Sequence, residues 1–369
     1  MDFSHDIPTR VFFGRKCLHK NKEHIAHFGR KALIVCGKTG AKASGAYEDA
    51  VDVLDELHIG YQTYDNVLNN PSLENVKEGG DFARAYRPDF IFAIGGGSPL
   101  DGAKAISALF SNDMEPMDLI EHPERIKQMV PVLAIPTTAG TGSEVTPYSV
   151  LTVPGLRTKK SFASYKAYPA VAFLDYRYTE SLPEKIAVDT ALDAFTHLLE
   201  SYLSKKCNPM VETFSLSGIS HFAECVSRIK ESKFDEDVRM HLMYASLMGG
   251  LAIAHTGTTF LHAMGYSLTY FKGMSHGNAN ALLTREYLRY NYPEAREKID
   301  RILGLLGFDC IDALGDFFEG LVEGIPGLLS EELAEFAGLS ALQNSIRNGP
   351  REIGIPEMTE IYRRTFTKI

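Results

Sequence analysis

The chain has 369 residues, of which 44% are hydrophobic and 23% are charged, so it is long enough for two globular domains with ordinary cores. Its formal net charge of −9 argues against a nucleic-acid or anionic-membrane partner, and no apolar run approaches the roughly 18–20 residues of a membrane span. Five scattered cysteines without a Cys-x-x-Cys pair, and a start without signal-peptide character, favour a cytoplasmic protein with reduced thiols.

The first half of the chain alternates apolar runs with helical periodicity, which predicts a parallel sheet covered on both faces. The apolar runs that predict strands are residues 31–36, 61–65, 89–94, 130–135 and 172–175. A helix is expected at 47–57, and another follows the glycines at 95–97. Residues 149–153 and 161–164 flank Pro154-Gly155 and predict a hairpin.

From about residue 180 the periodicity is helical and no strand is convincing. The expected helices include residues 189–200, 216–229, 238–254 and 331–346. The sequence therefore predicts two domains, an α/β domain at 1–179 and an all-helical domain at 180–369.

The helix expected at 189–200 carries a candidate metal site. Asp193 and His197 lie four residues apart and project from one face of the helix. A simple helical Asp–His hydrogen bond is the alternative interpretation. Further along the chain, His262 and His276 flank a segment whose glycines are placed to end one helix and begin another. Three imidazoles and one carboxylate suit a borderline divalent cation such as Fe²⁺ or Zn²⁺.

Two glycine-rich loops follow predicted strands and are candidates for phosphate binding. Residues 95–99 end a strand and open a helix, whose N-terminus offers free N–H groups to a pyrophosphate. The loop lacks the last glycine of Gly-x-Gly-x-x-Gly, where Leu100 stands, and it lacks the P-loop lysine, where Ala103 stands. Residues 137–143 are dense in hydroxyls and glycines. A purely structural turn is the alternative for each loop.

These motifs, in this order, resemble the iron-containing (metal-dependent) alcohol dehydrogenases. The resemblance is carried by Gly-Gly-Gly-Ser-Pro-Leu-Asp at 95–101, Pro-Thr-Thr-Ala-Gly-Thr-Gly-Ser-Glu-Val-Thr at 136–146, Asp193-Ala-Phe-Thr-His197, His262-Ala-Met-Gly and His276-Gly. It implies a Rossmann-like dinucleotide-binding domain followed by a helical metal-binding domain, as in the dehydroquinate synthase-like architecture.

The resemblance also implies roles for individual residues. The implied metal ligands are Asp193, His197, His262 and His276, with Fe²⁺ favoured as the metal and Zn²⁺ possible. The implied cofactor-binding residues are Gly37, Lys38, Thr39, Asn70, Gly96, Gly97, Ser98, Asp101, Thr137, Thr138, Thr141, Ser143 and Lys159.

Two departures from the family pattern bear on chemistry. Many members that prefer NAD carry an aspartate where Gly37 stands, and the segment that follows has no acid but holds Lys38 and Lys42, so NADP is favoured over NAD. Tyr266 stands where many members carry a second histidine that relays protons. It is a candidate catalytic residue, although a tyrosine that only lines the pocket is the equal alternative.

The expected function is hydride transfer between NADP(H) and a small neutral alcohol, diol or aldehyde, with a metal that polarises the substrate oxygen. No lysine or arginine lies between Asp189 and Glu200, and Lys272 alone lies between His262 and His276. That scarcity counts against the first alternative, a dehydroquinate synthase-like lyase with an anionic substrate. The second alternative is a non-catalytic nucleotide-binding protein. A homodimer is possible.

Overall fold

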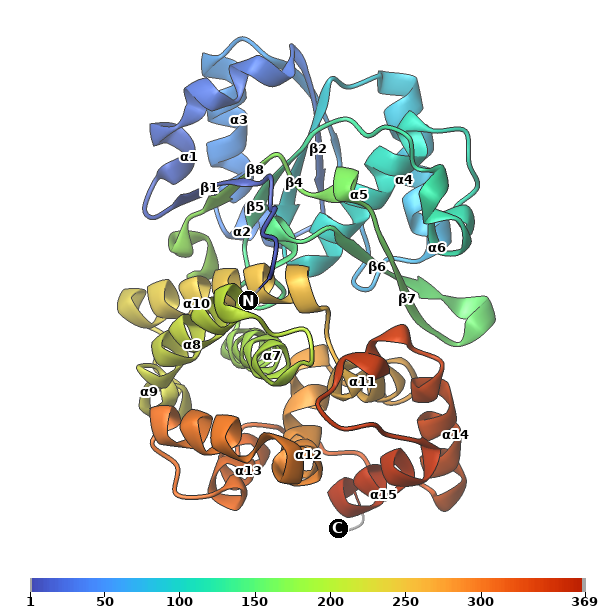
Figure 1. The fold of residues 1–369 in the computed structure, drawn as a ribbon. Helices are drawn as coiled ribbons and strands as arrows, with labels where there is room; N and C mark the ends of the chain where they lie inside the picture. The colour runs from blue at the N-terminus through green and yellow to red at the C-terminus, as the bar shows by residue number, and fades with distance from the viewer. Residues whose placement is uncertain (1, 367–369) are drawn as a thin grey trace. The chain divides into compact units, whose positions relative to one another are not determined.

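The computed structural model describes residues 2–366, and its internal contacts divide the chain into two units (Figure 1). The α/β unit runs from Asp6 to Leu182. The helical unit begins at Pro183 and includes the residues that precede Asp6.

The α/β unit is built on a six-stranded sheet. Its strands are β1 (Arg10–Phe13), β2 (Lys31–Cys36), β3 (Gly60–Tyr64), β4 (Phe90–Gly95), β5 (Val132–Pro136) and β8 (Val171–Leu174). Their order across the sheet is β1-β8-β5-β4-β2-β3, and every neighbouring pair is parallel. The expected parallel sheet is thereby confirmed.

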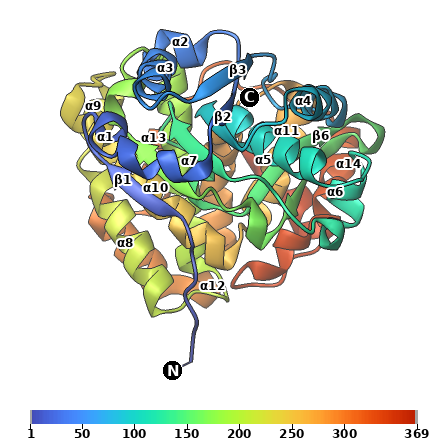
Figure 2. The ribbon, with the colours of Figure 1, turned by 90° about the horizontal axis from the view of Figure 1, so that it is seen from above.

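Helices cover both faces of this sheet. They are α1 (Cys17–Lys20), α2 (Gly40–Ala43), α3 (Ala46–Glu56), α4 (Leu73–Tyr86), α5 (Gly97–Ser111) and α6 (Asp118–Glu121). On β2, Ile34 belongs to a core shared with α1 and α3, and its neighbour Val35 to a core shared with α4 and α5. Alternate side chains of a strand point to opposite faces, so both faces are buried. Figure 2 shows α1 and α3 to one side of β2 and α4 and α6 to the other.

The expected hairpin is also present. Strands β6 (Tyr148–Val153) and β7 (Thr158–Ala163) pair antiparallel, and a turn that begins at Pro154 joins them. The edge strand β1 was not expected from the sequence. It is four residues long and only half-buried, so it lacks the long apolar run that identifies the central strands.

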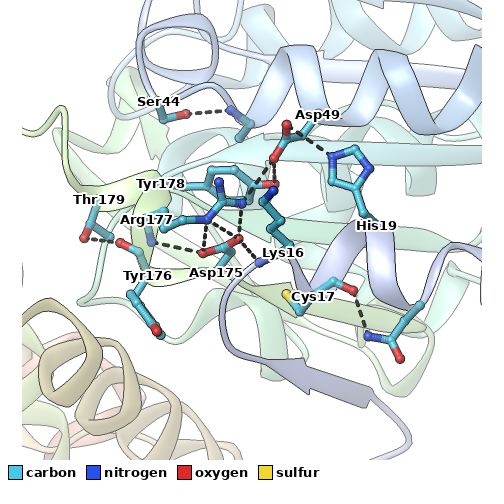
Figure 3. Close-up of polar contacts among 12 residues, drawn as sticks. Lys16, Cys17, His19, Ser44, Asp49, Asp175, Tyr176, Arg177, Tyr178 and Thr179 are labelled. Atoms are coloured by element: carbon cyan, nitrogen blue, oxygen red, sulfur yellow. Dashed lines mark hydrogen bonds and ion pairs between the residues drawn. The ribbon is translucent and has the colours of Figure 1, made fainter. Parts of the chain in front are cut away.

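A polar cluster fixes the carboxyl end of β8 to the segment after β1 (Figure 3). The Asp175 carboxylate accepts hydrogen bonds from the Lys16 backbone N–H at 2.6 Å and from the Arg177 guanidinium. Tyr178 donates its hydroxyl to Asp49 of α3 at 2.7 Å, and His19 Nε2 lies 3.3 Å from the same carboxylate. Because Asp175 is fully buried and the cluster joins the end of β8 to the segment after β1 and to α3, we interpret the cluster as structural.

The helical unit contains no strand between Pro183 and residue 366, the last that the structure describes. Its helices are α7 (Glu184–Leu203), α8 (Pro209–Ala223), α9 (Val226–Lys230), α10 (Glu236–Thr256), α11 (Phe260–Lys272), α12 (His276–Leu306), α13 (Ile311–Glu319), α14 (Ser330–Ala341) and α15 (Ile355–Phe366). Helix α7 is buried along most of its length and packs against α8, α10 and α12. Within residues 2–366, no helix has the length and apolar character that crossing a membrane requires.

The single helix expected at 216–229 is in fact two helices, α8 and α9, with a break at Glu224 and Cys225. The apolar residues Phe222, Cys225 and Ile229 keep helical spacing across the break and are all buried. Periodicity therefore could not reveal it.

Candidate active site

The candidate metal ligands of α7 lie in the buried middle of that helix. Asp193 and His197 are one turn apart, and their side chains are therefore on the same face. Both residues are buried, although neither is apolar. A buried carboxylate and imidazole require charged or hydrogen-bonding partners, which other helices of the same unit supply.

His262 and His276 join this pair from two further helices. His262 is in the first turn of α11, and His276 is the first residue of α12. Asp193, His262 and His276 each offer one ligand atom, and these three atoms lie within 4.8 Å of one another. The rings of His197 and His262 are stacked with centroids 4.5 Å apart. The structure thus brings the four residues together.

Two atoms of the cluster test whether it fits a cation. Asp193 is 3% exposed and His262 is 1% exposed, yet Asp193 Oδ1 and His262 Nε2 have no hydrogen-bond partner within the described chain. They lie 3.5 Å apart without hydrogen-bond geometry. Buried polar atoms without partners are rare in folded proteins. A divalent cation with nitrogen and oxygen ligands would satisfy both atoms, so the residues fit such an ion.

Charges within the cluster decide its protonation. Burial by itself would raise the pKa of Asp193, but the surrounding His197, His262 and His276 lower it below its usual range. Burial would lower the pKa of His262, but Glu200 and Asp193 raise it to about 9. In the metal-free cluster Asp193 is therefore a carboxylate, whose negative charge attracts a cation, and a metal that binds at His262 must displace a proton from its ring.

Two carboxylates of α7 that sequence reasoning passed over contact His262 and the first turn of α12. Glu200 is fully buried and hydrogen-bonded to His262 Nδ1. Asp189 accepts the backbone N–H of Asn278 at 2.8 Å, in the first turn of α12 that carries His276. The sequence contains a pattern that could have identified Asp189 and Glu200, because residues 189, 193, 197 and 200 follow helical spacing and form one stripe.

Tyr266 lies beside the candidate ligands. It is one turn after His262 on α11, and its ring stacks on that of His276, with centroids 5.2 Å apart and planes 14° apart. The stacking uses the ring and not the hydroxyl, which favours a packing role for this tyrosine.

The loops predicted to bind the dinucleotide lie at the carboxyl edge of the sheet in the α/β unit. Gly37 follows β2, Gly96 follows β4 and Thr137 follows β5. Since β4 lies between β2 and β5, the three strand ends are neighbours. The chain order reverses between β2 and β4, and ligands of open parallel sheets bind at such a switch point.

Close packing joins the two glycine-rich loops. Helix α5 begins at Gly97 after the N-cap Gly96. A methyl group at Gly97 would lie 2.7 Å from Thr141 Cγ2, and one at Gly96 would lie 3.1 Å from the Thr138 side chain. Glycine therefore lets the second loop approach the N-terminus of α5, where free N–H groups can bind phosphate.

Three further predicted cofactor residues form a chain of contacts. The Asn70 backbone N–H donates to Ser98 Oγ at 3.0 Å, and Lys159 Nζ donates to Asn70 Oδ1 at 2.7 Å. Lys159 is thus directed toward the α5 loop.

A buried lysine that sequence reasoning missed holds the second loop in place. Lys104 is fully buried and donates to the carbonyl oxygens of Ser143, Thr146 and Tyr148 at 2.7–3.0 Å. Asp101 accepts Ser143 Oγ at 2.5 Å and the Val150 N–H at 2.9 Å. These contacts give Asp101 and Ser143 a role in positioning the loop. Lys104 could have been identified from its spacing, because it lies three residues after Asp101 and therefore on the same side of α5.

The segment after β2 is open and basic. Gly37 has no positive φ, and a methyl group there would have the Val67 carbonyl oxygen as its nearest neighbour, at 3.4 Å. Lys38 and Thr39 are exposed. Lys42 Nζ lies 3.6 Å from Asp65, the residue after β3, in a half-exposed ion pair.

Comparison with known proteins identifies the same two parts. The family model for iron-containing alcohol dehydrogenases matches residues 8–176. The model for the C-terminal part of the Fe-containing alcohol dehydrogenase family matches residues 187–366. Together they cover both units.

Individual relatives share most of the chain's length. A crystal structure of an iron-containing alcohol dehydrogenase from Thermotoga maritima has a TM-score of 0.92 and 35% identity, over 99% of this chain and 100% of that one. Lactaldehyde reductase of Escherichia coli (strain K12) is 30% identical over 96% of this chain and 97% of its own. The NADPH-dependent butanol dehydrogenase of Clostridium saccharobutylicum is 28% identical over 88% of this chain and 82% of its own.

Proposed function

The chain belongs to the iron-containing alcohol dehydrogenase family, and on that basis we propose that it is a metal-dependent alcohol dehydrogenase or aldehyde reductase that uses NADP(H). The observation that carries the proposal is the cluster of three imidazoles and one carboxylate, in which the buried atoms Asp193 Oδ1 and His262 Nε2 form no hydrogen bond within the described chain. The family match also favours hydride transfer over the two alternatives, a lyase and a non-catalytic protein.

Asp193, His197, His262 and His276 would hold the metal. A divalent ion supplies a Lewis acid that lowers the pKa of a bound alcohol and polarises the carbonyl in the reverse direction. The helical unit already groups these residues, with Asp193, His197 and His262 buried and His276 half-buried, so little reorganisation is needed when the ion binds.

The α/β unit would bind and orient the dinucleotide, whose nicotinamide ring accepts or donates the hydride. The N-terminus of α5 binds the pyrophosphate through backbone N–H groups at Gly97 and Ser98. Lys159 adds a cation beside these groups. Lys104 and Asp101 keep the hydroxyl-rich loop in a fixed conformation, which orients Thr137, Thr138 and Thr141.

NADP is the cofactor that the end of β2 favours. Gly37 leaves room beside the backbone, and no acid occupies this position to repel a 2′-phosphate. Lys38 is exposed and carries a positive charge. Lys42 is partly neutralised by Asp65, which makes Lys38 the better partner for the phosphate.

The substrate is a small neutral alcohol, diol or aldehyde. Lys272 is the one lysine or arginine between His262 and His276, and it donates to Glu332 at 2.8 Å. Its charge is therefore not available to an anionic substrate. Butanol and lactaldehyde, named for two relatives, are molecules of this class.

Cofactor absorbance tests the proposal directly. The metal-loaded protein is mixed with NADPH or NADH and a panel of short aldehydes, and with NADP⁺ or NAD⁺ and the matching alcohols and diols. We expect turnover with neutral substrates and a higher kcat/KM with NADPH. No turnover with any member of the panel would contradict the proposal.

A further inference from the structure

One stripe of α7 contacts the whole cluster of candidate ligands. Asp193 and His197 are members of the cluster, and Glu200, three residues after His197, lies against His262 of α11. Glu200 is fully buried and belongs to no group of candidate ligands that the described structure shows. A buried carboxylate has a high cost in free energy unless hydrogen bonds satisfy it.

The two carboxylate oxygens of Glu200 have different hydrogen-bond partners. Oε1 accepts the Thr259 backbone N–H at 2.8 Å and the Thr259 hydroxyl. Oε2 faces His262 Nδ1. Because the N–H of Thr259 is a fixed donor, an oxygen must occupy the Oε1 position, and the carboxylate cannot rotate freely.

This arrangement fixes the tautomer of His262. A carboxylate accepts hydrogen bonds and does not donate them, so the Nδ1 that faces it carries the proton. Nε2 is then the ring nitrogen left for the metal, and it is the buried atom that forms no hydrogen bond within the described chain and lies 3.5 Å from Asp193 Oδ1. Carboxylates that hold metal-ligating histidines in this way also raise the basicity of the imidazole.

We propose that Glu200 is the positioning residue that makes His262 a metal ligand, by holding the proton on Nδ1 and directing Nε2 into the cluster. The inference rests on the proposed function, because it requires a metal bound through His262. Glu200 acts through His262 and contacts neither the metal nor the substrate.

The substitution Glu200→Gln separates this role from mere packing. Glutamine keeps the size of the side chain, and its amide oxygen must face the Thr259 N–H. Its NH₂ group then faces His262 Nδ1 and forces the proton onto Nε2, the atom that should bind the metal. We expect the dissociation constant of Co²⁺, measured by its visible absorption in titrations of metal-free protein, to rise 10- to 100-fold.

The matched control is Glu286→Gln on α12. Glu286 is also a buried glutamate of the helical unit, but its carboxylate pairs with Arg289. We expect this control to keep the wild-type dissociation constant, and circular dichroism verifies that both variants are folded. An equal loss in both variants would overturn the proposal, because the effect would then be general.

A second measurement does not depend on any variant. In Zn²⁺-loaded wild type labelled with ¹⁵N-histidine, NMR should show His262 protonated at Nδ1. A proton at Nε2, or an unchanged Co²⁺ dissociation constant in Glu200→Gln, would overturn the role of Glu200 and leave the proposed function standing. A wild type that binds neither ion would overturn both.

Discussion

At Gly37, a single side chain is expected to select the cofactor. The position follows β2 and has no positive φ, and a methyl group there would have no neighbour closer than 3.4 Å, so an aspartate fits without backbone strain. In Gly37→Asp, the carboxylate would lie near the 2′-phosphate of NADP and would accept a hydrogen bond from the free hydroxyl of NAD. Repulsion on the order of 1–4 kcal/mol lowers NADP affinity roughly ten- to several-hundred-fold.

The measurement for Gly37→Asp is the ratio of kcat/KM for NADPH to that for NADH. Gly338→Asp adds the same charge at an open position of α14 and should leave the ratio unchanged. An unchanged ratio in Gly37→Asp, or a wild type that prefers NADH, would show that the 2′-phosphate does not bind here.

Tyr266 provides a second test at the scale of one residue. Its ring stacks on His276, so Tyr266→Phe should keep both the metal affinity and kcat within about threefold of wild type. Tyr266→Ala removes the stack, which contributes about 0.5–1.5 kcal/mol, and should weaken metal binding roughly two- to tenfold. A loss of kcat on the order of 100-fold in Tyr266→Phe would instead assign proton transfer to the hydroxyl.

At the scale of elements, the contact between α7 and α12 sets the position of His276. A methyl group at Gly277 would lie 1.9 Å from the Asp189 carbonyl oxygen, so Gly277→Ala must displace the first turn of α12. We expect a loss of about 1–3 kcal/mol in the free energy of unfolding and at least a tenfold weaker metal affinity. Gly338→Ala, in the open interior of α14, is the control and should keep the metal affinity.

A buried glutamate in the loop that Lys104 holds should make the free energy of unfolding depend on pH. Burial raises the pKa of the nearby Glu144 from 4.5 to about 7. Between these values the folded state binds the extra proton, so the free energy of unfolding falls as pH rises through this window. Glutamine does not titrate, so Glu144→Gln should lack this pH dependence. The free energy of unfolding of the variant, relative to that of wild type, should therefore increase by about 2–3 kcal/mol from pH 4 to pH 8.

Unfolding in denaturant at several pH values measures this difference. Glu297→Gln, an exposed residue of α12, should give a curve parallel to that of wild type. If the stability of Glu144→Gln also ran parallel to that of wild type across this pH range, the Glu144 carboxyl of the wild type would not hold a proton near pH 7.

The elements that the sequence predicted best are those with long, regular apolar patterns. The central strands β2 and β4 are continuous apolar runs, and α7 combines apolar spacing with the Asp193–His197 pair. The edge strand β1 and the break between α8 and α9 leave no such pattern. The contacts of Glu200 and Lys104 join distant segments, so spacing along the chain could suggest these residues but could not identify their partners.

At the scale of the whole molecule, each unit carries one part of the proposed chemistry. The α/β unit holds the candidate cofactor loops at neighbouring strand ends, and the helical unit holds the candidate metal ligands around α7. The sequence predicted both parts, because each is carried by short motifs, such as residues 95–101 and the Asp193–His197 pair, that are recognisable without their neighbours in space. The order of the strands, and hence the switch point between β2 and β4, became known only from the structure.

The most direct test of this account is NADPH oxidation with a short aldehyde as Fe²⁺ is added, without oxygen, to metal-free protein. Wild type should gain activity in proportion to the metal up to one ion per chain and then stay constant. His262→Ala, which lacks one imidazole, should bind NADPH like wild type and remain inactive at the same metal concentrations. Full activity in metal-free wild type, or normal activation of His262→Ala, would contradict the account.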